Sequence, residues 1–328
     1  MNSILVVRRD NIGDLVCTTP LFHALRRRYP DAWIAALVNS YNAAVLDRNP
    51  HIDRVYAYTK LKHLEPGQSK ILAIQRRLAD LWALRRRSLE CVVVATAAGA
   101  PRTLRLARLL AARRIVSPSQ QLVREMEGRH EVERVYALAA ELGIDGPIPP
   151  LEVVPDPILV ARARQTFALL REHALRVAVQ ISTRRPAQRW PLEHFAALIG
   201  HLHALGAAPM VLWAPGPRDH PRHPGDDDLA AALMQQVGHR AVAFRTGTLP
   251  ELIGALAACD AVVTSDGGAM HVAAALRKPI VCFFGDVSPE QWRPWGVSHR
   301  ALRGASRRAA DISVEETLAA FRELMQLA

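Results

Sequence analysis

One stretch of the chain, residues 259–285, restricts the fold more than any other. A short apolar run, Ala261–Thr264, leads into the tetrapeptide SDGG at 265–268. A run of small residues, Ala269–Leu276, then precedes a second apolar run, Ile280–Phe284. This order predicts a strand, a glycine turn, a helix and a second strand. The first N–H groups of such a helix lack partners within it, which suits an anion such as phosphate. The glycine pair can also serve only the tight turn, so this stretch alone leaves both interpretations open.

Apolar runs alternate with amphipathic segments along the rest of the chain. Before residue 146 we predict strands at Ile4–Val7, Trp33–Val38, Val55–Tyr58 and Cys91–Ala95, and helices at 20–29, Ala43–Asn49 and Ile71–Arg87. After a proline-rich segment we predict strands at Arg176–Gln180 and Ala208–Trp213, and helices at Leu192–Leu205, Leu229–Val237, Leu249–Ala258 and Val314–Leu327. Such alternation predicts parallel sheets covered by helices on both faces.

The predicted fold class is therefore α/β, with two Rossmann-like domains whose sheets face an interdomain cleft. The proline-rich segment Gly146–Pro150, with Pro155 and Pro157 beyond it, marks the boundary. We expect domains at 1–155 and 156–313, and a C-terminal helix at about 314–328 for which packing against the first domain is one option. Ligands of such sheets bind beyond the carboxyl ends of the strands.

Composition narrows the class of protein. Half of the 328 residues are apolar, enough for two cores, and no apolar run reaches the ~18 residues of a membrane span. The first seven residues predict a strand rather than a signal peptide, because their apolar stretch is short. Four scattered cysteines form no CxxC pair, which predicts a reduced, cytoplasmic protein without structural zinc.

The positive charge of the chain is uneven. Residues 1–150 hold 23 Lys and Arg against 14 Asp and Glu, a net charge of +9, whereas the remainder holds 19 against 17, a net charge of +2. The first half therefore favours an anionic partner such as a lipid headgroup or membrane surface. Nucleic acid is not expected, because aromatic residues are sparse and no recognition motif appears. A generally basic proteome is the alternative explanation.

Two segments carry candidate catalytic and binding residues. Asp14 follows the first predicted strand, where a carboxylate can accept a proton from a substrate hydroxyl. Spacing alone favours a structural role for Asp14 over this one, namely capping of a helix or an ion pair with Arg8 or Arg9. In the second domain a strand runs into hydroxyl and guanidinium groups that suit a diphosphate or, alternatively, form a solvated loop. These residues are Ser182, Thr183, Arg184, Arg185 and Arg189.

Three further features have ordinary structural explanations. His271, in the first turn of the helix after the glycines, is expected to be a packed or hydrogen-bonded residue. The aromatic segment at 292–296 reads as a surface-loop anchor. The acidic run at 226–228 suggests helix capping rather than a metal site.

Three segments of the chain, in order, resemble the lipopolysaccharide heptosyltransferases of glycosyltransferase family 9. They are ILVVRRDNIGDLVCTTPLFHALRRRYPDA at 4–32, QRWPLEHFAALI at 188–199, and SDGGAMHVAAALRKPIVCFFG with PEQWRPWG at 265–296. The resemblance spans nearly the whole chain. It implies a GT-B fold and an inverting, metal-independent transferase with no cofactor. It also implies an ADP-heptose donor bound by the C-terminal domain and an inner-core acceptor sugar, Kdo or heptose, on the N-terminal domain. The implied location is cytoplasmic, peripheral on the inner membrane surface.

The resemblance also assigns roles to individual residues. It places the catalytic base on Asp14 and phosphate-contacting hydroxyls on Ser182 and Thr183. It places the donor loop on Asp266, Gly267, Gly268, Ala269 and His271. A basic acceptor-binding loop corresponds, loosely, to 60–70, with Lys60, Lys62 and Lys70 as its cations.

Two positions depart from the family pattern. Gln188 stands where the family has a lysine near the donor diphosphate, and Gly267 stands where it has a threonine. Arg184, Arg185 and Arg189 are therefore the expected source of positive charge for the departing ADP, with Arg189 as the specific replacement for the lysine. Two alternatives remain: a related transferase with another nucleotide sugar or acceptor, and a nucleotide-sugar-binding protein that has lost catalysis.

Overall fold

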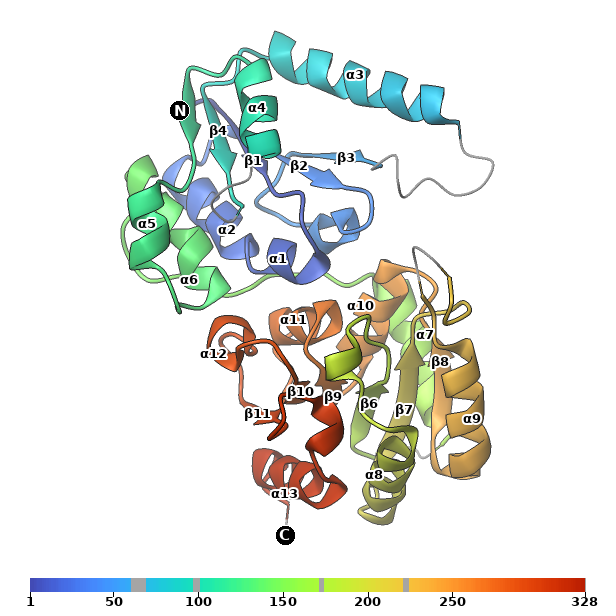
Figure 1. The fold of residues 1–328 in the computed structure, drawn as a ribbon. Helices are drawn as coiled ribbons and strands as arrows, with labels where there is room; N and C mark the ends of the chain where they lie inside the picture. The colour runs from blue at the N-terminus through green and yellow to red at the C-terminus, as the bar shows by residue number, and fades with distance from the viewer. Residues whose placement is uncertain (60–68, 97–100, 171–173, 221–223, 328) are drawn as a thin grey trace. The chain divides into compact units, whose positions relative to one another are not determined.

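The computed structural model describes residues 1–59, 69–96, 101–170, 174–220 and 224–327 (Figure 1). The chain divides into two compact units, Met1–Val154 and Pro155–Ala328. Each unit contains one sheet in which every described strand pair is parallel. The α/β class predicted from the alternating pattern is confirmed.

The first unit is built on a five-stranded sheet. Its strands are β1 (Ser3–Val7), β2 (Trp33–Asn39), β3 (Arg54–Tyr58), β4 (Cys91–Val94) and β5 (Arg114–Val116), in the spatial order β3-β2-β1-β4-β5. Strands β1 and β4 are buried along their whole length, as expected for central strands covered on both faces. Val7 is in register with Leu37 on one side and Val94 on the other. Strands β2 and β3 extend the sheet on one side of β1, and β4 and β5 extend it on the other. The order of the strands therefore reverses between β1 and β4.

Helices of the first unit are mostly short. They are α1 (Ile12–Val16), α2 (Thr19–Arg28), α3 (Lys70–Arg86), α4 (Pro101–Leu109), α5 (Gln120–Glu125) and α6 (Glu131–Tyr136), with 3-10 turns η1 (Ala43–Leu46) and η3 (Ala137–Leu142). Helix α1 lies where the sequence predicted only a loop, and η1 replaces the short helix predicted to Asn49.

The second unit repeats the plan with one more strand. Its strands are β6 (Arg176–Gln180), β7 (Ala208–Trp213), β8 (Val242–Arg245), β9 (Ala261–Ser265), β10 (Ile280–Phe284) and β11 (His299–Arg303), in the order β11-β10-β9-β6-β7-β8. Counted from β6, this is the 3-2-1-4-5-6 arrangement of the Rossmann fold. The order of strands reverses between β6 and β9, and ligands of such sheets bind beyond that point.

Helices on both faces complete the second unit. They are α7 (Pro157–Ala168), α8 (Leu192–Ala204), α9 (Asp227–Val237), α10 (Leu249–Ala258), α11 (Gly268–Ala275), α12 (Pro289–Trp292) and α13 (Val314–Met325), with 3-10 turns η4 (Pro186–Gln188), η5 (Gly238–Arg240) and η6 (Ala309–Asp311). Helix α13 packs against α8, β10 and β11 of its own unit. That it also contacts the first unit stays a prediction.

Two general expectations can be compared with the described residues. All four cysteines are buried and free. None of the helices in the described ranges is both long and apolar enough to cross a bilayer.

The packing of α13 gives a stability prediction. Phe321 is fully buried in the core of the second unit, among side chains of α8, β10 and the strands beside it. We expect Phe321→Ala to lower the free energy of unfolding of this unit by about 3–5 kcal/mol, because it leaves a cavity. Urea unfolding followed by tryptophan fluorescence checks this value. Leu169→Ala, at a position 80% exposed, is the control and should change stability by no more than about 0.5 kcal/mol. Equal effects of the two substitutions would contradict the assigned packing.

Candidate active site

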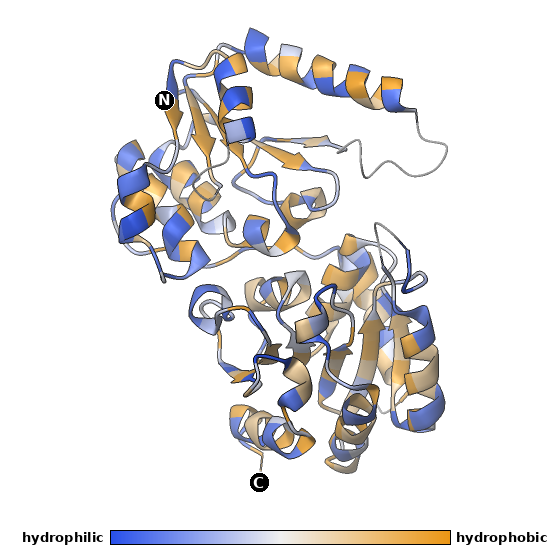
Figure 2. Cartoon of the chain, in the orientation of Figure 1, coloured by the Kyte–Doolittle hydropathy of each residue, from blue (hydrophilic) through white to orange (hydrophobic). Residues whose placement is uncertain are grey.

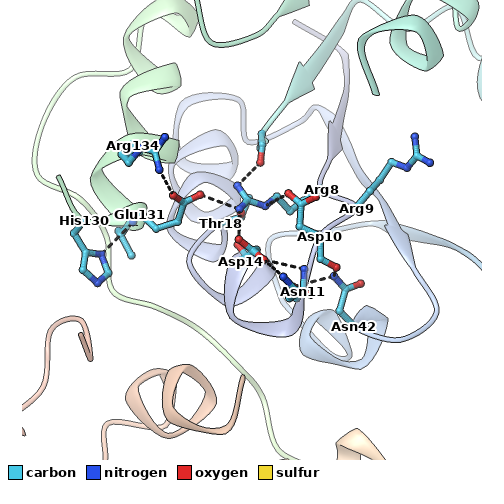
Figure 3. Close-up of polar contacts among 12 residues, drawn as sticks. Arg8, Arg9, Asp10, Asn11, Asp14, Thr18, Asn42, His130, Glu131 and Arg134 are labelled. Atoms are coloured by element: carbon cyan, nitrogen blue, oxygen red, sulfur yellow. Dashed lines mark hydrogen bonds and ion pairs between the residues drawn. The ribbon is translucent and has the colours of Figure 1, made fainter. Parts of the chain in front are cut away.

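A buried guanidinium group organises the end of β1 (Figure 3). Arg8 is 1% exposed, and its Nη2 atom donates to Asp14 Oδ1 at 2.7 Å and to Glu131 Oε1 at 2.8 Å. Its Nη1 atom donates to the carbonyl of Ala95, directly after β4, and its Nε atom is ion-paired with Asp10 at 3.2 Å. Burial alone would lower the pKa of Arg8, but the three carboxylates outweigh it and raise that pKa. The guanidinium therefore stays charged and joins β1, β4, α1 and α6.

Asp14 lies in the first turn of α1 with its carboxylate held on both oxygens. Oδ1 accepts from Arg8, and Oδ2 accepts from the backbone N–H of Asn11 at 2.8 Å and from Asn11 Nδ2 at 3.0 Å. The ion pair with Arg8 considered from the sequence is therefore present. A carboxylate has about four lone-pair positions, so these three donors leave one for a substrate hydroxyl. The residue is 9% exposed, which fits a base in a partly dry site.

The loop between β1 and α1 is fixed by asparagine side chains. Asn39, at the end of β2, donates to the carbonyl groups of Arg9 and Asp10, and Asn42 donates to those of Asp10 and Asn11. Both asparagines are buried. The position of Asp14 thus depends on β2 as well as on β1 and β4.

The candidate acceptor lysines are only partly covered by the structure. Lys60 and Lys62 lie outside the described residues. Lys70 is the first residue of α3 and is exposed. Among the described contacts, Lys70 makes none with Asp14 or Arg8. The structure therefore does not bring Lys70 together with these two residues.

In the second unit, two segments far apart in the sequence meet beyond the β6 and β9 ends. Gln188 Nε2 donates to Asp266 Oδ2 at 2.7 Å across 78 residues, and Ser265 Oγ donates to the carbonyl of Gln188 at 2.7 Å. Gly285, after β10, permits the close approach, since a Cβ there would lie 2.2 Å from the carbonyl oxygen of Ala187. The predicted donor residues 182–189 and 266–271 therefore come together.

The two candidate hydroxyl groups have different neighbours. Ser182 Oγ accepts the backbone N–H of Ala214 at 2.9 Å, which leaves its own O–H available to donate. Thr183 Oγ1 donates to Gln188 Oε1 at 3.4 Å, a long hydrogen bond that a phosphate oxygen could displace.

The candidate arginines are not equivalent. Arg189 Nη1 is paired with Asp226 at 3.2 Å, and that carboxylate is 3% exposed in side chain. Arg185 makes a long pair with Asp286 at 3.8 Å, and both side chains are more than half exposed. Asp226 is the N-cap residue of α9 but makes no capping bond through its side chain, so the capping role expected for it was wrong. Its role is to hold Arg189.

The glycine turn has a backbone that few residues can adopt. Gly267, the N-cap of α11, has φ 154° and ψ −169°, a region open essentially to glycine alone. Gly268 and Ala269 form the first turn of the helix, where N–H groups have no intrahelical partner. His271 is 2% exposed and meets the Trp292 ring edge-on at 5.8 Å, in line with the packed residue expected.

Asp266 is a partly buried acid, and no ion pair is found for it among the described residues. Burial raises the pKa of its carboxyl to about 6, while the hydrogen bond from Gln188 and the charge of Arg185 act in the opposite direction. A lysine at position 188 would place an ammonium group beside this carboxylate. The amide of Gln188 instead gives Asp266 a neutral hydrogen-bond partner.

Among the described residues, one cluster of side chains could in principle bind a metal ion, and its members are distant in sequence from the donor-site residues. Ligand atoms of His23, His51 and Glu152 lie within 4.8 Å of one another. His51 Nε2 is already paired with Glu152 Oε2 at 2.8 Å, and the two imidazoles stack at 4.3 Å. This cluster is explained by its internal contacts. The acidic run at 226–228 is not gathered around a common point, since Asp226 holds Arg189 and Asp227 accepts from Trp213 Nε1 at 2.7 Å.

Sequence reasoning missed three charged residues of the site. Glu131 and Arg134, on α6, form an ion pair at 3.0 Å beside Arg8, and with Thr96 they line a small pocket. Asp226 was noted but not as the partner of Arg189. No motif marks these residues, because their contacts are made across the chain: Glu131 lies 123 residues from Arg8, and Asp226 lies 37 residues from Arg189. A buried arginine after a central strand, which needs carboxylates around it, was the available signal.

Comparisons with known proteins agree with this architecture. A family model described as "Glycosyltransferase family 9 (heptosyltransferase)" matches residues 87–320. Lipopolysaccharide heptosyltransferase 2 of Escherichia coli (strain K12) is 30% identical over 319 residues, covering 91% of this chain and 86% of that protein.

Solved structures share the fold. A glycosyl transferase family 9 protein from Veillonella parvula superposes with a TM-score of 0.82 at 19% identity, covering 99% of this chain and 97% of its own. The E. coli heptosyltransferase WaaC with ADP superposes with a TM-score of 0.78 at 20% identity, covering 98% and 99%. The two-sheet arrangement of these relatives is the GT-B fold that the sequence predicted.

The pKa of Asp266 gives a pH prediction. The folded value of about 6 lies above the usual 3.8, so this group's stabilisation is present at low pH and is lost as pH rises through 6. We expect the unfolding free energy of the wild type, relative to Asp266→Asn, to fall by roughly 2 kcal/mol between about pH 4 and pH 7. Urea unfolding across this range measures the difference. Asp219→Asn is the control, because this exposed carboxylate is not among the groups that shift the pKa of Asp266. A difference between wild type and Asp266→Asn that is independent of pH would refute the raised pKa.

Proposed function

Because the chain belongs to glycosyltransferase family 9, the heptosyltransferase family, we propose that it transfers heptose from ADP-heptose to an inner-core sugar of lipopolysaccharide, Kdo or heptose. Transfer would invert the anomeric carbon and need no metal. The observation that carries the proposal is the junction of Gln188 and Asp266 at the glycine turn, beyond the strands where a Rossmann sheet binds nucleotides. The similarity to lipopolysaccharide heptosyltransferase 2 supports the choice of donor and acceptor.

The donor diphosphate would lie against the N-terminus of α11. The N–H groups of Gly268 and Ala269 and the positive end of the helix favour the charge that grows on the departing ADP. Ser182 would donate its hydroxyl to a phosphate oxygen. Arg185 and Arg189 would supply the fixed positive charge that Gln188 does not provide, because a guanidinium binds phosphate through two parallel N–H groups.

Asp14 would be the general base. Its open lone-pair position would accept the proton of the acceptor hydroxyl as the oxygen attacks the anomeric carbon. Arg8 would hold the carboxylate in place, because the short contact at 2.7 Å fixes the orientation of Oδ1. Asp14 therefore contributes the base, and Arg8 acts as a positioning residue.

The acceptor would bind to the first unit. Its anionic Kdo and phosphate groups match the net charge of +9 over residues 1–150. We include Lys60, Lys62 and Lys70 in this role as part of the proposal. Such an acceptor is anchored in lipid, so the enzyme would work in the cytoplasm as a peripheral protein on the inner face of the membrane.

The base role is tested by Asp14→Asn. We expect turnover of ADP-heptose with purified core acceptor to fall about 10²–10⁴-fold, since the positioned base is lost. ADP affinity, measured by calorimetry, should stay at the wild-type value, because every donor group named above belongs to the second unit. Asp10→Asn is the matched control: it also removes a carboxylate from Arg8, but at an exposed position. Near-normal turnover in Asp14→Asn would remove the residue from its role.

Arg189 offers a separate test of the donor site. We expect Arg189→Ala to weaken ADP-heptose binding roughly tenfold or more, because a charge-assisted hydrogen bond to phosphate is lost. Asp226→Asn is the comparison, since it keeps the guanidinium and frees it from its partner, and its donor affinity should be unchanged or higher. If instead both variants bind the donor as the wild type does, Arg189 does not replace the missing lysine.

A further inference from the structure

Helix α3 exposes an unusual amount of apolar surface. Ten large hydrophobic side chains are exposed in the described part of the chain, and five of them lie on this one helix. They are Ile71, Leu72, Ile74, Leu78 and Trp82. Ile71 is 70% exposed, Trp82 is 61% and Leu78 is 59%. Figure 2 shows hydrophobic residues as orange bands along α3, alternating with blue bands of hydrophilic residues.

The exposed residues form a stripe that the first unit does not use. Positions 71, 74, 78 and 82 are spaced by three or four residues, so they share one side of the helix. A different side packs on the sheet, where Leu84 is fully buried and Leu81 is partly buried against the core of the first unit. The helix therefore has two apolar sides, and only one of them serves the fold.

The charge on the helix is strongly positive. From residue 70 to residue 87 it carries one acid, Asp80, against six bases. The bases are Lys70, Arg76, Arg77, Arg85, Arg86 and Arg87. Arg86 lies over the Trp82 ring with its guanidinium carbon 4.5 Å from the ring centroid, so a cation borders the apolar stripe.

This pairing of properties selects the partner. Basic side chains beside an apolar stripe that ends in tryptophan are typical of helices that lie in the interface of an anionic bilayer. Arginine stems can lie along the acyl region while their charged ends reach the lipid phosphates. A protein partner would instead need an apolar groove bordered by several carboxylates. No feature of the described residues points to such a groove in a partner.

We propose that α3 docks the protein on an anionic lipid surface, with Ile71, Ile74, Leu78 and Trp82 inserted at the headgroup level and Arg86, beside them, bound to phosphate. Arg77 and Arg87 lie over aromatic rings of the first unit and Arg85 donates to the carbonyl of Leu109, so these three add positive charge near the surface. The idea deepens the proposed function, because a lipid-anchored acceptor is presented at such a surface. It identifies α3 as the element by which the protein would attach to the membrane surface.

The test is flotation of the full chain with vesicles of phosphatidylcholine alone or with about 30% phosphatidylglycerol. The wild type should bind the anionic vesicles at least about tenfold more tightly, and salt near 0.5 M should weaken that binding. The triple variant Ile74→Gln, Leu78→Gln, Trp82→Gln should lose about tenfold or more of this affinity. Its matched control is Leu109→Gln, Ile158→Gln, Leu169→Gln, which removes three even more exposed apolar side chains elsewhere. Circular dichroism confirms that both variants are folded.

A transfer assay on a deacylated, soluble acceptor separates this proposal from the function on which it rests. The α3 variant should keep wild-type turnover there, since none of its residues belongs to the proposed catalytic site. Vesicle binding that is lost in the variant while wild-type transfer persists supports the proposal, and vesicle binding without any transfer sinks only the proposed function. Equal vesicle affinity in the wild type and the α3 variant overturns the docking role. So does a wild-type dimer that the α3 variant converts to a monomer without any vesicle binding, which would make the stripe an interface between two copies.

Discussion

Parallel pairing is the constraint on which the rest of this structure depends. When all strands of a sheet run the same way, their carboxyl ends share one edge, and the loops that leave them are neighbours whatever their distance in sequence. In the first unit this brings Arg8, after β1, to the carbonyl of Ala95, after β4. In the second unit it brings Gln188 to Asp266. The order of strands thus decides which side chains can cooperate.

The two units treat buried charge in opposite ways. Arg8 is almost inaccessible, yet three carboxylates and a carbonyl surround it, so the desolvation of its charge is offset by contacts in known directions. Asp266 is partly buried beside an amide and has no cation within contact distance among its described partners. A buried charge that has enough hydrogen-bond and ion-pair partners, such as Arg8, holds the surrounding groups in fixed positions. A charge with fewer partners, such as Asp266, is sensitive to what binds beside it, so a neighbouring diphosphate would change its protonation.

Much of this could be predicted from sequence, and the limits follow physical lines. Buried central strands such as Ile4–Val7 and Ile280–Phe284 were predicted because their apolar runs are continuous. Strands β5, β8 and β11 were missed, because each lies at an edge, carries arginine, and is only partly apolar. The carboxylate after β1 and the glycine turn after β9 were predicted from local pattern. The partners that orient them were not, since Glu131 reaches Arg8 across 123 residues and no local pattern encodes such a contact.

The backbone at Gly267 has a consequence for how this site could have diverged. A threonine there would bring a Cβ into a conformation of φ 154° that side chains rarely adopt. Introducing a hydroxyl side chain at this position would therefore take more than one codon change, because the turn itself would have to be rebuilt around the new residue. Gly267 and Gln188 adjoin Asp266 from two sides, one along the chain and one across it. An inhibitor shaped around a lysine at 188 and a threonine at 267 would find neither here.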